Sequence, residues 1–481
     1  MKIVIAGAGA VGSHLAALLS REDQDIILID ENPEKTARLL ASGDLDLMTL
    51  NVSPTSVSGL REGGVGECDL FIAVTPEETR NITCCMIAHA LGARKTVARV
   101  DTAEYAMPQQ RDLFRKMGVG SVIYPEGLAA QEILDGIRRP WVRQYWETAG
   151  GRLVMLGVKL REKARITGVP LHSLCDAGTP YRIALIKRGD DTIIPSGSDC
   201  LRVGDIVYFM TTKQHISYIR EIAGKEDYDD VRDVMIMGGG RTSVHVAEGR
   251  CLLPTWGEAE GGCSSLPSGE QKGAGLIKII EQDEERCRRI GELVGGDRRI
   301  RIVRGDGRDT TLLLEEGLPE MQAFCALTPQ TETNILACLA AKRMGVPKTV
   351  ALVDNMDYIP MAEKLDIGTV INKKMIAAGR IYQMMLDSDA LGVKCLTAAG
   401  ADVAEVVVGE GSPAGKKPVS HLGLPPGITL GGFVRGTGEG ALVYGSTLLE
   451  PGDRVVVFCK SGLIKQLDRY FSKKRSGLHL F

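Results

Sequence analysis

The sequence predicts an α/β protein with two doubly wound parallel-sheet domains, each followed by a smaller α+β domain. Three observations predict this class. The chain repeats itself, a glycine-rich loop follows the first apolar strand of each copy, and β-rich runs broken by Gly and Pro follow each copy. The length of 481 residues exceeds one ordinary core and fits four domains, at roughly 100–200 residues per domain.

The repeat is visible in two pairs of segments. TPEETRNITCCMIAHALGARKTVARVD begins at Thr75 and TPQTETNILACLAAKRMGVPKTVALVD begins at Thr328, an offset of 253 without a gap. Upstream, KIVIAGAGAVGSHLA begins at Lys2 and DVMIMGGGRTSVHVA begins at Asp233, an offset of 231. The difference of 22 residues (253 minus 231) indicates an insertion in the second copy near 250–275, where Gly, Ser and Pro are frequent. We expect a partly disordered surface loop there.

The repeat also gives the expected domain boundaries. Each half contains a parallel-sheet domain, a crossover helix and a small domain. The expected ranges are 1–124, 125–145 and 146–228 in the first half, and 231–371, 372–392 and 393–475 in the second. The helix near 127–138 has an apolar face of Leu128, Ile133 and Ile137 and ends at Pro140. That face belongs either to the chain's own core or to an assembly contact.

Composition excludes several classes of protein. The formal net charge of −3 and pI of about 6.2 argue against a general nucleic-acid binder, which is usually strongly basic. No apolar run approaches the ~18–20 residues needed to cross a bilayer, so we expect a cytoplasmic protein without direct membrane insertion. The twelve cysteines are scattered and form no C-x-x-C pair, which is typical of small core residues in a reducing compartment. We therefore predict no metal site.

The glycine-rich loop of the first copy predicts a dinucleotide site. Strand 2–6 leads into a helix through the six-residue loop Gly7, Ala8, Gly9, Ala10, Val11 and Gly12, and a second strand at 26–29 ends at Asp30. This is the Rossmann-like context that G-x-G-x-x-G requires. The glycines allow a tight turn, close approach to a pyrophosphate and close helix–strand packing, and the helix N-terminus attracts the anion. Asp30 can accept hydrogen bonds from a ribose. The alternative is a fold that keeps its glycines for packing alone.

Two further strands of the first copy, 70–74 and 96–100, end in polar residues. Open α/β sheets bind their ligands at that edge. Thr75 is therefore placed to approach the ligand, and Arg99 to reach its phosphates. The alternative for Arg99 is an ordinary surface salt bridge.

The second copy departs from this pattern. Its loop reads Gly238, Gly239, Gly240, Arg241, Thr242 and Ser243, so that serine replaces the third glycine. Leu352 stands where the first copy has Arg99, and Glu281 replaces Asp30. Asp306 follows another strand, where the first copy has Ser53. Weaker binding, a different nucleotide or an empty site are the alternatives that the sequence leaves open for this copy.

These motifs resemble the TrkA family, the peripheral subunits of Trk-type potassium transport systems. The resemblance rests on the duplicated KIVIAGAGAVG…LID unit, the AVTPEETRN segment, the VARV strand and the repeated β domain with its Gly-Asp turn. It covers nearly the whole chain except 250–275. The large domains look like RCK (KTN) N-terminal domains and the small ones like RCK C-terminal domains. The resemblance implies ligand contacts at Gly7 to Val11, Asp30, Thr75, Pro76 and Arg99, and at Gly238 to Thr242, Glu281, Thr328 and Pro329.

The resemblance also implies ligands and partners. Members of the family bind NAD(H) and adenine nucleotides such as ATP or ADP. They form dimers or tetramer rings on the cytoplasmic face of the plasma membrane. There they gate potassium flux through an integral-membrane subunit of the TrkH or TrkG type. The sequence leaves open whether the small domains bind a second effector, such as a cyclic dinucleotide.

We expect regulation rather than catalysis. A dehydrogenase needs a group that handles the proton accompanying hydride transfer, placed in a substrate pocket. The chain has seven histidines, none of them in a segment with the features of a substrate domain. We therefore predict no catalytic residues. An NAD-dependent oxidoreductase and a nucleotide sensor for another transporter are the alternatives.

Overall fold

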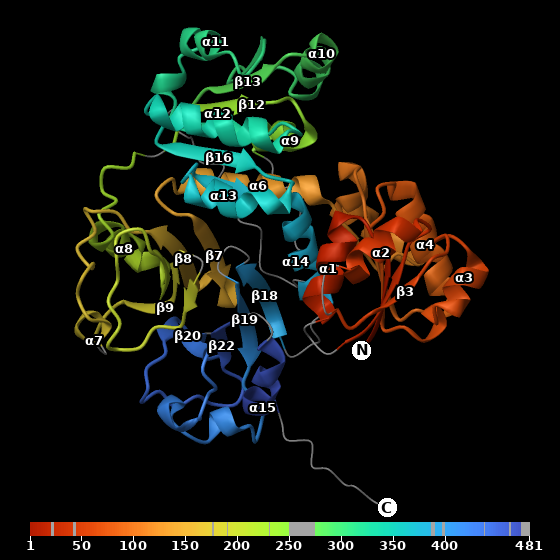
Figure 1. Ribbon diagram of the computed structural model, residues 1–481. Coiled ribbons are helices and arrows are strands. Elements are labelled where there is room, and N and C mark those ends of the chain that lie inside the picture. Colours follow the sequence, from red (N-terminus) through yellow and green to blue (C-terminus); the bar gives the residue numbers. More distant parts are fainter. Residues whose placement is uncertain are drawn as a thin grey trace, which may run out of the picture. The chain divides into compact units, whose positions relative to one another are not determined.

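The computed structural model divides the chain into two compact units, and each unit contains parts of both halves of the sequence. The first unit is Met1–Pro140 with Asp229–Met385, and the second is Trp141–Tyr228 with Leu386–Phe481. The structure describes residues 1–20, 24–41, 45–175, 178–189, 191–229, 231–249, 275–385, 390–396, 400–436, 438–460 and 463–472. The insertion predicted near 250–275 lies outside the described residues up to 274. The first unit contains both parallel sheets, and the second contains both small domains (Figure 1).

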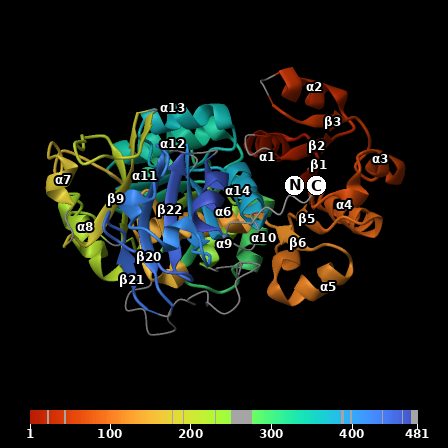
Figure 2. The same cartoon turned by 90° about the horizontal axis from the view of Figure 1, so that it is seen from below.

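The first half begins with a six-stranded parallel sheet of order β3-β2-β1-β4-β5-β6. Its strands are β1 Lys2–Ala6, β2 Asp25–Ile29, β3 Met48–Leu50, β4 Leu70–Ala73, β5 Lys95–Arg99 and β6 Ser121–Ile123. Its helices are α1 Ala10–Ser20, α2 Pro33–Ala41, α3 Val57–Glu62, α4 Glu78–Leu91 and α5 Arg111–Lys116. In Figure 2, β3 and β6 lie toward opposite edges of this sheet. Ile3 to Ala6 are fully buried, so both faces are covered, which explains why these strands are continuous apolar runs.

The second half contains a parallel sheet of the same order, β14-β13-β12-β15-β16-β17. Its strands are β12 Val234–Met237, β13 Ile277–Glu281, β14 Ile300–Arg304, β15 Ala323–Ala326, β16 Lys348–Leu352 and β17 Thr369–Ile371. Its helices are α9 Arg241–Glu248, α10 Glu284–Leu293, α11 Thr310–Glu315, α12 Thr331–Arg343 and α13 Ile359–Lys364. The strand order reverses beside β1 and beside β12, the point at which open α/β sheets bind ligands.

A crossover helix follows each parallel sheet: α6 Pro125–Arg138 after the first, and α14 Lys373–Met385 after the second. Helix α6 packs on α9 of the second half, and α14 packs on α1 of the first half and on α6 (Figure 1). Ile133 and Ile137 of α6 belong to one hydrophobic core with Val244 and Ile279 of the second half. Two of the three residues predicted for the apolar face of this helix, Ile133 and Ile137, are therefore part of the chain's own core.

The second unit consists of two antiparallel sheets, of order β10-β9-β11-β8-β7 and β18-β19-β22-β20-β21. The first has β7 Gln144–Thr148, β8 Leu153–Lys159, β9 Tyr181–Arg188, β10 Asp191–Ile193 and β11 Ile206–Thr211. The second has β18 Ala390–Leu396, β19 Ala401–Val407, β20 Ile428–Val434, β21 Gly440–Leu442 and β22 Arg454–Lys460. Short helices accompany them: α7 Leu171–Leu174, α8 Ile216–Ile222 and α15 Asp468–Phe471.

The turn before the fifth strand of the first small domain is braced by an ion pair that recurs in the second. Arg188 donates to both carboxylate oxygens of the buried Asp205, at 2.9 and 2.8 Å. Arg435 does the same to Asp453, at 3.1 and 3.0 Å.

The two sheets also share one core, to which Met155 and Phe458 both belong. The fold class predicted from the sequence is thus confirmed. Among the described residues, no helix combines the length and the apolar character needed to span a bilayer.

Candidate nucleotide-binding sites

The first glycine loop has two glycines that packing requires and one that it does not. Gly7 has φ of +113°, a backbone conformation that other residues rarely adopt. A Cβ atom on Gly12 would lie 1.9 Å from the carbonyl oxygen of Gly7, so any side chain there would clash with the loop. A Cβ atom on Gly9 would meet nothing within 4 Å. The fold does not need glycine at Gly9, and open space beside the backbone is what the approach of a pyrophosphate requires.

Asp30, at the end of β2, fixes this loop. Its Oδ2 atom accepts a hydrogen bond from the Ala8 N–H at 2.7 Å, and its Oδ1 atom accepts one from the Asn32 N–H at 2.9 Å. Lys35 lies 3.7 Å from Oδ2. The structure therefore brings the predicted acid to the predicted loop. The carboxylate already orders the backbone, and it can accept a further hydrogen bond from a ribose hydroxyl through its remaining lone pairs.

A buried asparagine, which the sequence reasoning used only as a repeat marker, organises the edge of the sheet. Asn81 makes four hydrogen bonds: its Oδ1 accepts from Thr75 N (2.8 Å) and Thr75 Oγ1 (2.7 Å), and its Nδ2 donates to the carbonyls of Thr75 (3.0 Å) and Arg99 (2.9 Å). Asn334 makes the equivalent bonds to Thr328 (3.1, 2.6 and 2.7 Å) and to the Leu352 carbonyl (2.8 Å). The two strand ends at each site are therefore joined in the same way.

Arg99 lies at the carboxyl edge of the first sheet, as predicted. Its Nη1 donates to the Thr75 carbonyl at 3.2 Å and reaches the Pro76 carbonyl at 3.5 Å. Its Nη2 donates to Asp101 Oδ1 at 2.7 Å. The salt bridge considered as the alternative therefore exists. Because the side chain is still about one-fifth exposed, it is accessible to a ligand at the same edge.

The rim of the first site carries an ion pair that the residues of the second site cannot form. Arg80 of α4 donates to both oxygens of Glu31, at 2.9 and 2.6 Å, and its hydrogen bond lowers the pKa of that carboxyl. By the repeat, Gln282 and Thr333 stand at these places in the second half, and both line a cavity there. The second site is therefore less charged at this rim.

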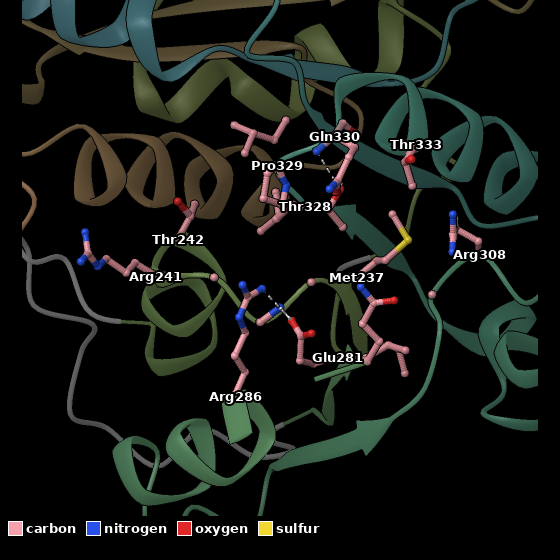
Figure 3. A pocket seen from close by; sticks show the side chains of 18 of the residues that line it. Met237, Arg241, Thr242, Glu281, Arg286, Arg308, Thr328, Pro329, Gln330 and Thr333 are labelled. Carbon is pink, nitrogen blue, oxygen red and sulfur yellow. Dashed lines mark hydrogen bonds and ion pairs between the residues drawn. The ribbon is translucent and has the colours of Figure 1, made fainter. Parts of the chain in front are cut away.

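The second half contains a cavity of about 460 Å³ at the carboxyl ends of its strands (Figure 3). It is lined by every residue predicted for the second site, namely Gly238, Gly239, Gly240, Arg241, Thr242, Glu281, Asp306, Thr328 and Pro329. Figure 3 shows Arg241 and Thr242 on one side, Glu281 below, and Thr328 and Pro329 above the opening. The structure thus brings these residues together around one cavity.

One carboxylate of this cavity reproduces the geometry of the first site. Glu281 Oε2 accepts from the Gly239 N–H at 2.7 Å and Oε1 from the Asp283 N–H at 2.9 Å, as Asp30 does for its own loop. Asp306 forms a two-point ion pair with Arg308, at 3.0 and 2.7 Å, and Arg308 keeps the pKa of Asp306 below its usual value. Ser243, in place of the third glycine, is completely buried.

The lining also includes a charged cluster that the sequence reasoning did not assign to the site: Glu126, Asp354 and Lys373. Lys373 Nζ lies 3.5 Å from Glu126 Oε1 and 3.4 Å from Asp354 Oδ2. Glu126 comes from α6 of the first half, so the cavity is completed across the repeat. No motif marks Glu126 or Lys373, because they come together only through the packing of the crossover helices.

The structure describes the side chains of nine cysteines. None of these nine forms a disulfide, and six of them are buried. Burial raises the pKa of Cys68 to about 11 and that of Cys84 to about 12. Within the part of the chain that the structure describes, no group of three or more His, Cys, Asp or Glu side chains could hold a metal ion.

Two Rossmann-like halves, each with a glycine loop, an acid after the second strand and a small antiparallel domain, define a tandem module of the RCK class. The TrkA-N domain matches residues 3–125 and 267–373, and the TrkA-C domain matches residues 156–224 and 403–472. The chain belongs to the TrkA family. The resemblance inferred from the sequence is thereby confirmed, and so is the prediction of a transport regulator rather than an enzyme.

Relatives match over nearly their whole length. The chain is 28% identical to the Trk system potassium uptake protein TrkA of Halomonas elongata, over 98% of each chain. It is 29% identical to the TrkA homolog of Archaeoglobus fulgidus, over 98% of this chain and all of the relative. Among solved structures, the GsuK RCK domain superposes with a TM-score of 0.57 at 16% identity, covering 97% of this chain and 94% of that one. The GsuK channel bound to NAD gives the same TM-score and identity, covering 98% of this chain and 78% of that one. This structural likeness concerns the fold alone.

Proposed function

We propose that this chain is the regulatory subunit of a Trk-type potassium uptake system, which binds NAD(H) or an adenine nucleotide at its two Rossmann-like sites. The observation that carries the proposal is the cavity in the second half. It lies at the carboxyl ends of the strands, beside the glycine loop and Glu281, as ligand sites in this fold do. Family membership and the NAD bound to the GsuK channel support the choice of ligand.

The switch works through differential binding. A ligand shifts an equilibrium between two arrangements only by its difference in affinity for them. The glycine loop of the second half leads directly into α9, and α9 packs on α6, which is separated from the last strand of the first sheet by Tyr124 alone. A nucleotide that binds more tightly to one packing of α6 on α9 therefore changes the position of one parallel sheet relative to the other. The membrane partner, of the TrkH or TrkG type, responds to that change.

The proposal includes assembly of several copies at the cytoplasmic face of the plasma membrane, as a dimer or a tetramer ring. Apolar side chains on the second parallel-sheet domain support it. Leu336 of α12 is 65% exposed, and Met361 and Leu365 at α13 are 42% and 43% exposed. Large exposed apolar side chains are candidates for contacts between copies of the chain. Light scattering of the purified protein, beside Leu336→Glu, tests this part: the variant should form smaller particles.

Calorimetric titration with NADH and with ATP tests ligand binding. We expect the wild type to bind, Asp30→Ala to weaken the first site and Glu281→Ala to weaken the second. Asp25→Ala is a matched control, because Asp25 is an exposed carboxylate at the opposite end of the same strand as Asp30. Absence of binding by the wild type would refute the proposed ligands. Potassium flux through a reconstituted TrkH-type partner, with and without nucleotide, then tests regulation directly.

A further inference from the structure

The two halves place a basic side chain against equivalent carboxylates in different ways. In the first half, Arg99 at the end of β5 pairs with Asp101 at 2.7 Å. By the repeat, Leu352 and Asp354 stand at these places in the second half, and Leu352 is buried and uncharged. Asp354 has a cationic neighbour nevertheless, because Lys373 Nζ lies 3.4 Å from its Oδ2 atom.

The strand register explains where this lysine comes from. Arg99 is paired with Ile123 of β6, and Leu352 with Ile371 of β17. Two residues beyond these partners, the first half has Pro125 and the second half has Lys373. The positive charge has therefore moved from one strand end to the N-terminus of the next helix, while remaining beside the same carboxylate.

Lys373 lies on the side of the cavity away from the arginine ion pairs. The glycine loop follows β12, the strand at the middle of the site. Arg286 and Arg308 lie on the side of β13 and β14, where they accompany Glu281 and Asp306. Lys373 lies on the opposite side, at the ends of β16 and β17. A pyrophosphate above the loop would lie between these two sides.

The lysine is shared by two carboxylates that are incompletely satisfied. Its Nζ atom is 3.5 Å from Glu126 Oε1 and 3.4 Å from Asp354 Oδ2, too far for strong hydrogen bonds. The second oxygens, Glu126 Oε2 and Asp354 Oδ1, are buried and accept no hydrogen bond from the described residues. The Glu126 side chain is only 12% exposed. Two carboxylates compete for one ammonium group, and a phosphate in the cavity would compete with both.

We propose that Lys373 is the phosphate-binding residue of the second site in place of the missing arginine, and that its ion pair with Glu126 couples occupancy of this site to helix α6. The inference rests on the proposed function, nucleotide binding in this cavity. A phosphate that attracts Lys373 weakens the ion pair between Lys373 and Glu126, and Glu126 is the second residue of α6. Helix α6 starts two positions after the last residue of β6. A ligand bound by the second half therefore affects the first sheet through α6.

The test is calorimetric titration with ADP and with adenosine in an Asp30→Ala background, which leaves the second site as the main one. Lys373→Met should weaken ADP binding by about tenfold, the usual effect of losing a charge-assisted contact, and should not change adenosine binding. Lys116→Met is the matched control, an exposed lysine at the end of α5. Circular dichroism melting confirms that each variant is folded.

The partner carboxylate gives an effect of opposite sign. Glu126→Gln removes a competitor for Lys373 and should tighten ADP binding by about threefold. In the Lys373→Met background this gain should become smaller. If Glu126 acted only by repelling phosphate, Glu126→Gln would tighten ADP binding by a larger factor in the Lys373→Met background, because Lys373 would no longer offset the charge of Glu126. A larger or equal gain overturns the role of Lys373.

The outcomes separate this inference from the proposed function. If Glu281→Ala weakens ADP binding and Lys373→Met does not, the cavity binds nucleotide and the assignment of Lys373 is wrong. If the Asp30→Ala protein does not bind ADP at all, nucleotide binding in the second half fails and the assignment fails with it. If both substitutions weaken ADP binding while adenosine binding depends only on Glu281, the assignment is supported.

Discussion

Tyr124 and His245 connect the two halves of the first unit through a hydrogen bond of 2.7 Å between the phenol oxygen and Nε2. Their rings meet edge to face, with centroids 5.5 Å apart and an interplanar angle of 85°. Tyr124 directly precedes α6, and His245 lies within α9. Both side chains are buried. A specific polar contact thus fixes the crossover helix against the helix that follows the second glycine loop.

Removing this contact should destabilise the first unit. Tyr124→Phe leaves a buried ring nitrogen without this partner, so we expect a loss of about 1–2 kcal/mol in the free energy of unfolding. Urea unfolding followed by circular dichroism measures it. Tyr218→Phe is the control, since Tyr218 is 44% exposed and should tolerate the change. Equal stability of both variants would contradict a structural role for the contact.

The second and third glycines of the first loop should separate binding from packing. Gly12→Ala places a methyl group 1.9 Å from a carbonyl oxygen, and we expect a loss of about 1–3 kcal/mol in stability. Gly9→Ala meets no neighbour, so its melting temperature should be unchanged. It should still weaken NADH binding by about tenfold, because the methyl group occupies the space of the pyrophosphate. Unaltered NADH affinity in a folded Gly9→Ala protein would mean that this loop does not contact the ligand.

Glu78 should make the stability of the first unit depend on pH. Burial alone would raise its pKa, but hydrogen bonds from the Thr102 hydroxyl (2.7 Å) and the Asp101 and Thr102 N–H groups (2.8 Å each) outweigh burial and lower it. A lowered folded pKa stabilises the native state above the unfolded value, about 4.3 for Glu, and the benefit is lost as pH falls through the folded pKa.

Glu78→Gln should therefore be less stable than the wild type by about 1–2 kcal/mol near neutral pH. The difference should shrink below a pH of about 4, where the wild-type carboxyl becomes protonated. Urea unfolding of both proteins across this pH range measures it. A difference that is independent of pH would show that the charge of Glu78 has no part in its contribution.

The paired asparagines should have matching effects. Asn81→Ala and Asn334→Ala each remove a fully buried side chain that joins two strand ends, and each should cost about 2–4 kcal/mol in the free energy of unfolding. Urea unfolding of the two variants measures both losses. Thr79→Ala is the control, because Thr79 is an exposed polar residue in the first turn of α4, the helix that also carries Asn81. A large effect in only one half would show that the two sites depend on this residue differently.

The parts of the site that repeat along the chain were predictable, and the parts made by packing were not. The loop Gly7 to Val11, Asp30 and Thr75 lie at strand ends fixed by local pattern, and their counterparts line a cavity in the second half. Asn81 was visible as a repeated residue, but no local sequence pattern predicted its four hydrogen bonds.

Glu126 and Lys373 could not be found from pattern at all. They are far apart in the sequence and meet only because α6 packs on the second half. The substitution of Leu352 for arginine was visible, and it left weaker binding, a different nucleotide or an empty second site open. Only the structure identified a lysine at the next strand end beside the same carboxylate. A residue that replaces a missing charge in this way has no fixed position in the sequence, since its place depends on where helices pack.

Because both halves are one polypeptide, the glutamate that reaches into the second cavity always comes from the same molecule as the cavity itself. Dilution cannot remove it, and no exchange of subunits can replace it with a mismatched copy. The wall of this cavity therefore forms in a unimolecular step, independent of the protein concentration. The two halves can also differ in sequence, so that every molecule has two unlike candidate sites, one in each half.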